Sequence, residues 1–258
     1  MLVTVPPHKF FVDQISEHTI PVQLMVPVGA SSHTYEPTPK QILSAVKADM
    51  WFTIGESFEP KATRALASYN PQLQIVDMRQ GVNLIRDDGH HHCCACHPGA
   101  EDVHYWLSAR EAQAQALTIY NALSARYPEK KEIFTRGYQK FISDLKALDS
   151  ELSTTLQPAN GRAILVSHPA YSYLLRDYGM GQISIEFEGK DPTPLQLTNT
   201  LRDAKNAKVT KVFVQPQYPS KGATLIGREI GAKVVTLEPY SENYFETMRQ
   251  IAKEFATP

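Results

Sequence analysis

The stretch PEKKEIFTRGYQKFISDLKALDSELSTTL, from Pro128 to Leu156, organises the whole chain. Its apolar residues recur every three or four positions, which predicts one continuous helix with a single buried stripe. The stripe consists of Phe134, Tyr138, Phe141, Leu145, Leu148, Leu152 and Leu156. At 1.5 Å per residue this helix is roughly 40 Å long, longer than a small lobe is wide. No other stretch repeats a coiled-coil heptad, so we expect a helix that lies across two lobes.

On both sides of this helix, short apolar runs alternate with amphipathic runs, which is typical of βα units around a mostly parallel sheet. The expected strands are 22–28, 50–54, 73–77, 162–167, 182–187, 211–215 and 233–237. The expected helices are 39–48 with Thr38 as N-cap, a helix opened by a capping box from Ser108 to Glu111 and ending near Arg126, 194–204, 222–230 and 243–255.

This pattern predicts an α/β fold with two lobes, each a mostly parallel sheet covered by helices, joined by one long rigid linker helix. We expect an N-terminal lobe at 1–127, the linker helix at 128–157 and a C-terminal lobe at 158–258. A turn-rich segment, Gln157 to Gly161, marks the start of the second lobe.

Charge and hydropathy exclude several classes of partner. The 258 residues carry 26 Lys and Arg against 27 Asp and Glu, a formal charge of -1, so no basic field is present to bind nucleic acid or an anionic membrane surface. The longest uncharged apolar run covers only 22–28, whereas a membrane-spanning helix needs about 20 residues. The N-terminus lacks the pattern of a signal peptide, so we expect a protein that is either cytosolic or exported with its signal already absent.

Histidines and a glutamate follow the predicted strands. His33 and His168 each follow a strand, as does Glu238, and ligands of open α/β sheets collect at the carboxyl ends of strands. His104 lies between aromatic residues shortly before Ser108. Each histidine taken alone is more often a hydrogen-bonded structural residue, but three imidazoles and one carboxylate together form a set suited to Zn²⁺.

Successive members of this set lie 64 to 71 residues apart, too far for a zinc finger, so tertiary folding has to bring them together. Three other carboxylates compete for the fourth position, and any of them could instead be a solvated residue at a strand end. These are Glu186, Glu188 and Glu242.

A second metal-binding feature is the segment 87–97, which contains four histidines and three cysteines. They are His90, His91, His92, Cys93, Cys94, Cys96 and His97. Thiolates and imidazoles at this density bind Zn²⁺ or Cu⁺, and we interpret the segment as a low-specificity metal-collecting loop. A redox role for Cys93 and Cys96 is the weaker alternative, because no strand-to-helix context surrounds them. The three cysteines are adjacent, so no disulfide framework links distant parts of the chain.

Five segments, in order along the chain, resemble the metal-binding solute-binding proteins of zinc and manganese ABC importers. They are PVGASSHTYEPTP (27–39), KAD (47–49), DVHYWLS (102–108), SHPAY (167–171) and the closing βαβ segment 222–238. The resemblance covers nearly the whole chain. It implies two α/β lobes joined by a rigid helix, with one divalent cation bound between them by His33, His104, His168 and Glu238.

The resemblance further implies a periplasmic or cell-surface receptor, without enzymatic activity, that delivers its cation to an ABC transporter membrane permease. We expect a monomer. A histidine-rich loop before the second ligand is typical of the zinc-binding members of this family. The third imidazole, His168, favours Zn²⁺, because Mn²⁺ is harder and prefers oxygen ligands. A receptor for manganese or iron is the alternative within the family.

Two alternatives belong to other classes of protein. A zinc hydrolase needs an open metal position and a nearby general base, yet no His-Glu-x-x-His pair is present and only Glu36 lies close to a ligand. A cell-surface adhesin would use the cation as a structural element only.

Overall fold

The structure is a computed structural model that describes residues 1–86, 101–186, 192–218 and 221–257. It divides into two compact units made of separated segments. The first contains Met1–Asn83, Ala109–Leu148 and Tyr240–Tyr244, and the second contains Leu84–Ser108, Asp149–Pro239 and Phe245–Pro258. The division therefore falls within the long helix α5 (Lys131–Leu156), whose 26 residues match the predicted helix.

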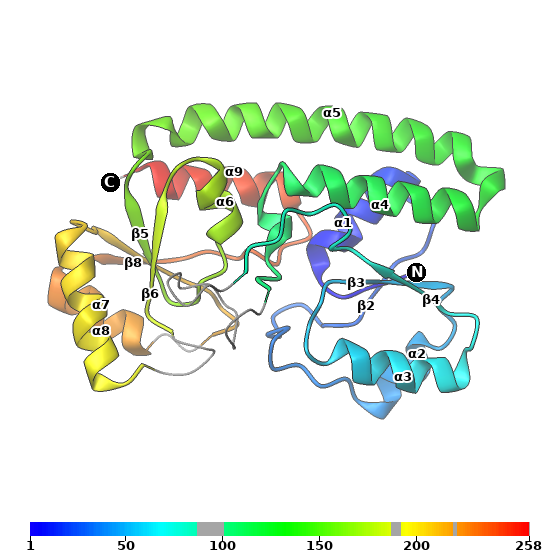
Figure 1. Ribbon diagram of the computed structural model, residues 1–258, viewed down its shortest axis with the longest axis horizontal. Coiled ribbons are helices and arrows are strands. Elements are labelled where there is room, and N and C mark those ends of the chain that lie inside the picture. The colour runs from blue at the N-terminus through cyan, green and yellow to red at the C-terminus, as the bar shows by residue number, and fades with distance from the viewer. Residues whose placement is uncertain (87–100, 187–191, 219–220, 258) are drawn as a thin grey trace. The chain divides into compact units, whose positions relative to one another are not determined.

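The first unit is built on a parallel sheet with the strand order β2-β1-β3-β4. The strands are β1 (Leu2–Val3), β2 (Gln23–Leu24), β3 (Met50–Thr53) and β4 (Gln74–Asp77). Helices α2 (Pro39–Ala45) and α3 (Glu59–Tyr69) cover one face, and α1 (Pro6–Ser16) and α4 (Glu111–Arg126) cover the other (Figure 1). The core beneath α2 and α3 joins Leu2 and Trp51 of the sheet to Ala45 and Leu66 of the helices.

Three elements of this unit were not predicted, namely β1, α1 and α3. Strand β1 has only two residues, too few to show a period of two. Helix α1 begins at a Pro-Pro pair after Val5, whose side chain offers no capping group. The strand predicted at 22–28 is confined to Gln23–Leu24, because Pro21 and Pro27 limit the pairing on both sides.

The second unit repeats the architecture with the parallel strand order β6-β5-β7-β8. Its strands are β5 (Ala163–Val166), β6 (Gly181–Ser184), β7 (Lys211–Val214) and β8 (Lys233–Thr236). Helices α7 (Pro194–Asn206) and α8 (Lys221–Ile230) cover one face, and α6 (Ser172–Asp177) and α9 (Tyr244–Ala256) lie on the other (Figure 1). The rings of Phe213 and Phe255, whose centroids are 4.8 Å apart, join β7 to α9.

The apolar stripe of α5 is buried as predicted at six of its seven positions, and Tyr138 is half-buried and stacks on Tyr120 of α4. The Thr38 cap is confirmed, because its hydroxyl accepts the backbone N–H of Gln41. The capping box at Ser108 is wrong. Helix α4 begins only at Glu111, and the Ser108 hydroxyl instead donates to Asp177 Oδ2 at 2.5 Å.

All four strands of each sheet run in one direction, so their carboxyl ends share one edge. The loops that carry His33, His168 and Glu238 follow β2, β5 and β8 at this edge of their own sheets. Among the described residues, no helix combines the length and the apolar composition needed to cross a membrane.

Candidate metal centre

His104 lies immediately before the short 3-10 helix η1 (Tyr105–Leu107) and is fully buried. Its Nδ1 donates to Asp102 Oδ1 at 2.9 Å, and the same oxygen accepts its backbone N–H at 2.9 Å. Tyr173 fixes this turn by donating its hydroxyl to the Asp102 carbonyl at 2.7 Å. An ionised carboxylate only accepts hydrogen bonds, so Nδ1 carries the proton and Nε2 carries the lone pair that a metal needs.

His168 follows β5 and is held in the same way. Its Nδ1 donates to Glu186 Oε2 at 3.0 Å, just beyond the end of β6. Its ring is stacked on Tyr218, with centroids 3.9 Å apart and an interplanar angle of 11°. The carboxylate and the stacked ring together fix both the tautomer and the plane of the imidazole.

The structure brings His104 and His168 together in the second unit, with their Nε2 atoms 3.4 Å apart. Two nitrogen ligands of a tetrahedral zinc ion, each at 2.0–2.1 Å, are separated by about 3.3–3.4 Å. Two lone pairs at this distance repel one another, so a cation between them stabilises the arrangement. The pair therefore has the spacing of half a zinc site.

His33 lies in the first unit, on the loop between β2 and α2. Its Nδ1 is 3.0 Å from Glu56 Oε1 and 3.1 Å from Oε2. All three histidines therefore share one pattern, in which a carboxylate binds Nδ1 and Nε2 is the ring atom suited to bind a metal.

Glu238 lies two residues beyond β8, in the second unit. Its two oxygens accept hydrogen bonds from Gln217 Nε2 at 2.8 and 2.6 Å. Burial raises the pKa of the nearby Tyr171 hydroxyl, and the negative charge of Glu238 raises it further, against a hydrogen bond from Gln215. Gln217 thus orients the Glu238 carboxylate.

Other candidate carboxylates have different partners. Glu186 binds His168 Nδ1, Glu242 binds Lys9 Nζ at 2.9 Å, and Glu36 binds Lys61 Nζ at 2.8 Å. Glu188 and the seven His and Cys residues of the segment 87–97 lie outside the described residues.

The three carboxylates that bind Nδ1 of the histidines were not predicted from the sequence, namely Asp102, Glu56 and Glu186. Asp102 stands two residues before His104 within a quoted motif, so this spacing was an available signal. Glu56 is 23 residues from His33, and Glu186 was considered only as a ligand, so neither pairing could be inferred from local sequence.

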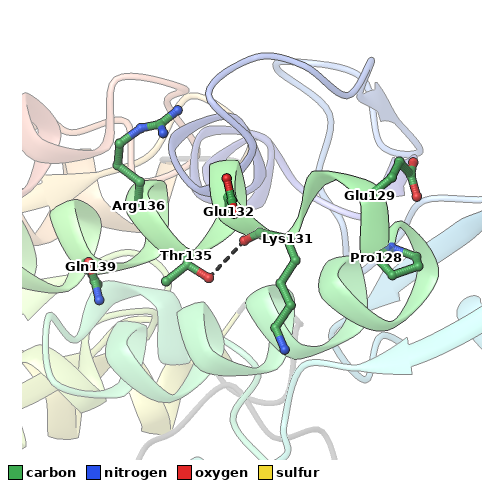
Figure 2. Close-up of a pocket in the computed structure, with 7 residues that line it drawn as sticks. All are labelled: Pro128, Glu129, Lys131, Glu132, Thr135, Arg136 and Gln139. Atoms are coloured by element: carbon green, nitrogen blue, oxygen red, sulfur yellow. Dashed lines mark hydrogen bonds between the residues drawn. The ribbon is translucent and has the colours of Figure 1, made fainter.

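A surface groove of about 610 Å³ lies at the start of α5 in the first unit, and Figure 2 shows its lining. The lining is polar and contains no histidine or cysteine: Pro128, Glu129, Lys131, Glu132, Thr135, Arg136 and Gln139. Two of its side chains have partners, since Thr135 Oγ1 donates to the Lys131 carbonyl at 2.8 Å and Arg136 pairs with Glu17. This groove lacks the donor set of a transition-metal site.

Comparison with known proteins agrees with this chemistry. The family model "Zinc-uptake complex component A periplasmic" (ZnuA) matches residues 1–257. The high-affinity zinc uptake system protein ZnuA of Bacillus subtilis is 28% identical over 247 residues, covering 92% of this chain and 77% of the relative. A crystal structure of ZnuA superposes with a TM-score of 0.91 at 30% identity, covering 99% of this chain and 96% of that one.

A second solved structure, the SBP FpvC from Pseudomonas aeruginosa in complex with Mn²⁺, has a TM-score of 0.84 at 26% identity and covers 99% of this chain and 96% of that chain. The family match extends over nearly every residue, including both units and all four candidate ligands. The chain therefore belongs to the ZnuA family, the periplasmic component A of zinc-uptake complexes.

Proposed function

We propose that this protein is the metal-binding receptor of a zinc importer, with His33, His104, His168 and Glu238 as the ligands of one Zn²⁺ ion. The observation that carries the proposal is the His104–His168 pair, with its Nε2 atoms 3.4 Å apart and each Nδ1 bonded to a carboxylate. His33 supplies a third imidazole held in the same way, and Glu238 supplies an oxygen.

The donor set favours Zn²⁺ over Mn²⁺. Imidazole is a good ligand for zinc, whereas Mn²⁺ prefers carboxylate, carbonyl and water oxygens. The three carboxylates that bind Nδ1 make each imidazole a stronger electron donor, which adds to its affinity for zinc. The relative FpvC was solved with Mn²⁺, so a manganese or iron receptor is the alternative that has to be tested.

In this role the protein binds its cargo outside the cytoplasm and passes it to a membrane permease. The family model describes a periplasmic component of an uptake complex, which supports both the location and the partner. We further propose that the protein does not act as a hydrolase. Glu36, which the hydrolase alternative would require as a base, is exposed and paired with Lys61.

Calorimetry on metal-free protein tests the proposal. We expect one tight zinc site per chain and much weaker binding of Mn²⁺, with zinc displacing manganese in competition. Tight binding of Mn²⁺ that zinc cannot displace would support the alternative, and the lack of any tight zinc site would overturn the proposal. Zinc-dependent ester or peptide hydrolysis by the loaded protein would restore the hydrolase alternative.

A further inference from the structure

The buried carboxylate of Glu59 is a prominent polar group in the first unit that the proposed zinc site does not use. It lies at the first residue of α3 with an exposed fraction of 3%. It accepts the backbone N–H groups of three consecutive residues, at 2.9 Å from Ile54, 2.7 Å from Gly55 and 3.0 Å from Glu56. One side chain therefore fixes the whole turn that follows β3.

Glu59 is itself anchored to the sheet. Thr4, directly after β1, donates its hydroxyl to Glu59 Oε1 at 2.5 Å, and Trp51 of β3 donates its indole N–H to Thr4 Oγ1 at 3.1 Å. Each of these side chains is buried. The turn is thus tied to both central strands through a carboxylate that has little freedom to move.

The backbone of the turn depends on a glycine. Gly55 has φ +101°, a conformation that L side chains rarely adopt, and a Cβ there would meet the Arg79 side chain at 3.2 Å. Without Glu59, the N–H groups of Ile54, Gly55 and Glu56 would lose the acceptor that holds all three of them.

The last residue of the turn is Glu56, whose carboxylate binds His33 Nδ1. We infer that Glu59 is a positioning residue for the metal site. It fixes the turn and thereby the position of the Glu56 carboxylate, and Glu56 holds His33 in the tautomer that has its lone pair on Nε2. The inference rests on the proposed function for its effect on zinc, but its effect on His33 is a property of the metal-free protein.

The matched control is Glu111, another buried carboxylate in the first turn of a helix. It accepts the backbone N–H of Asn83 at 3.0 Å, far along the chain from the turn that holds Glu56. Glu111→Ala therefore reproduces the loss of a buried capping carboxylate in the same unit. Glu59→Gln serves as the conservative variant, because the amide oxygen can still accept hydrogen bonds.

The experiment measures imidazole ¹⁵N shifts in metal-free protein and zinc affinity by calorimetry. Burial raises the pKa of Glu59 to about 7, against the hydrogen bonds from Thr4, Ile54 and Gly55, so both measurements are made near pH 8, above that pKa. The His33 signals are assigned by their loss in His33→Asn.

We expect wild-type His33 to carry its proton on Nδ1. In Glu59→Ala we expect a mixture of tautomers at His33 alone and a zinc affinity about 10-fold weaker, the lower end of the effect of outer-shell changes. Glu59→Gln should recover most of both readouts, and Glu111→Ala should change neither.

A Glu59→Ala protein that keeps the wild-type His33 tautomer and zinc affinity would overturn the inference, as would an equal effect of Glu111→Ala. If Glu59→Ala does not fold, Glu59→Gln decides: a partial change of the His33 tautomer relative to the wild type, confined to His33, supports the inference, and the wild-type tautomer overturns it. A wild-type protein without zinc affinity would instead refute the proposed function, and the tautomer measurement would still decide the role of Glu59.

Discussion

Each of the three candidate histidines is hydrogen-bonded through Nδ1 to its own carboxylate. Asp102, Glu56 and Glu186 come from three different parts of the chain, yet each accepts a hydrogen bond from Nδ1 of its histidine and so favours the tautomer with the lone pair on Nε2. The partner therefore matters to binding almost as much as the ligand does.

Substitutions of His168 and of Asp102, the carboxylate partner of His104, compare the effect of a proposed ligand with that of a carboxylate partner. His168→Ala should weaken zinc binding more than 100-fold, whereas Asp102→Asn should weaken it by about 10- to 100-fold, since the amide can accept or donate and no longer fixes the tautomer. The control is His18→Asn, because His18 is exposed and asparagine tolerates its φ of 58°. Chelator competition measures all three, and unchanged affinity in His168→Ala would remove that residue from the ligand set.

His8 makes a separate prediction about stability and pH. It is fully buried in α1, where burial lowers its pKa to about 4 although the hydrogen bond that its Nε2 donates to Gln115 Oε1 opposes the shift. The unfolded chain binds a proton near the ordinary pKa of 6.5, so the folded state is favoured above that pH and loses this contribution as the pH falls toward 4.

The test compares urea unfolding of the wild type and of His8→Gln, which does not titrate. As the pH rises from 4 to 7, the unfolding free energy of the wild type should increase by about 3 kcal/mol more than that of His8→Gln. This follows because the folded-state pKa of about 4 lies below the ordinary value of 6.5, and each pKa unit is worth about 1.36 kcal/mol. A constant difference across this range would show that His8 is not held neutral by burial.

At the scale of elements, the long helix illustrates what a sequence can predict. Its stripe from Phe134 to Leu156 is strongly periodic over many turns, and the helix forms where the periodicity places it. Strands after the helix were also predictable, because β5, β7 and β8 are short runs rich in β-branched residues between turn residues. The two-residue strand β1 and the helix after it lack such a signal, and their positions are set by tertiary packing alone.

The positions of His33 and His168 could be predicted for the same reason, because each follows a predicted strand at a known edge of a parallel sheet, whereas His104 follows no strand. Their carboxylate partners could not, with the exception of Asp102, since Glu56 and Glu186 meet their histidines only through the register of the folded sheets. The Ser108 capping box failed because a tertiary partner, Asp177, takes the hydroxyl that would cap the helix.

Gly137 of α5 provides a prediction at this scale. A Cβ there would collide with the Ile15 carbonyl and lie 2.7 Å from the Gln14 carbonyl, both at the end of α1. Glycine to alanine in a free helix stabilises it by about 1 kcal/mol. Here the collision of the added Cβ with the α1 backbone outweighs this gain, and Gly137→Ala should lower the unfolding free energy by about 1–3 kcal/mol.

The matched control for this substitution is Ser143→Ala, at an exposed position of the same helix, which should be neutral or slightly stabilising. Thermal and urea unfolding measure both variants. A Gly137→Ala protein as stable as the wild type would mean that α1 and α5 do not approach as closely as described.

At the scale of the whole molecule, the proposed tight zinc site is distinct from the metal-collecting segment predicted at 87–97. Deletion of Gly89–His97 removes all seven of the additional His and Cys residues and none of the four proposed ligands. We expect the total zinc bound per chain to fall while the tight phase of a calorimetric titration persists. Disappearance of the tight phase would place a primary ligand within the deleted segment.

X-ray absorption at the zinc edge of the one-to-one complex measures which atoms bind the zinc ion and how far from it they lie. Three imidazoles and a carboxylate predict only nitrogen and oxygen neighbours at about 2.0–2.2 Å, with the multiple-scattering pattern of three histidine rings. The spectrum of His168→Ala should lose one ring. A sulfur neighbour at about 2.3 Å, or fewer than three imidazoles in the wild type, would contradict the account.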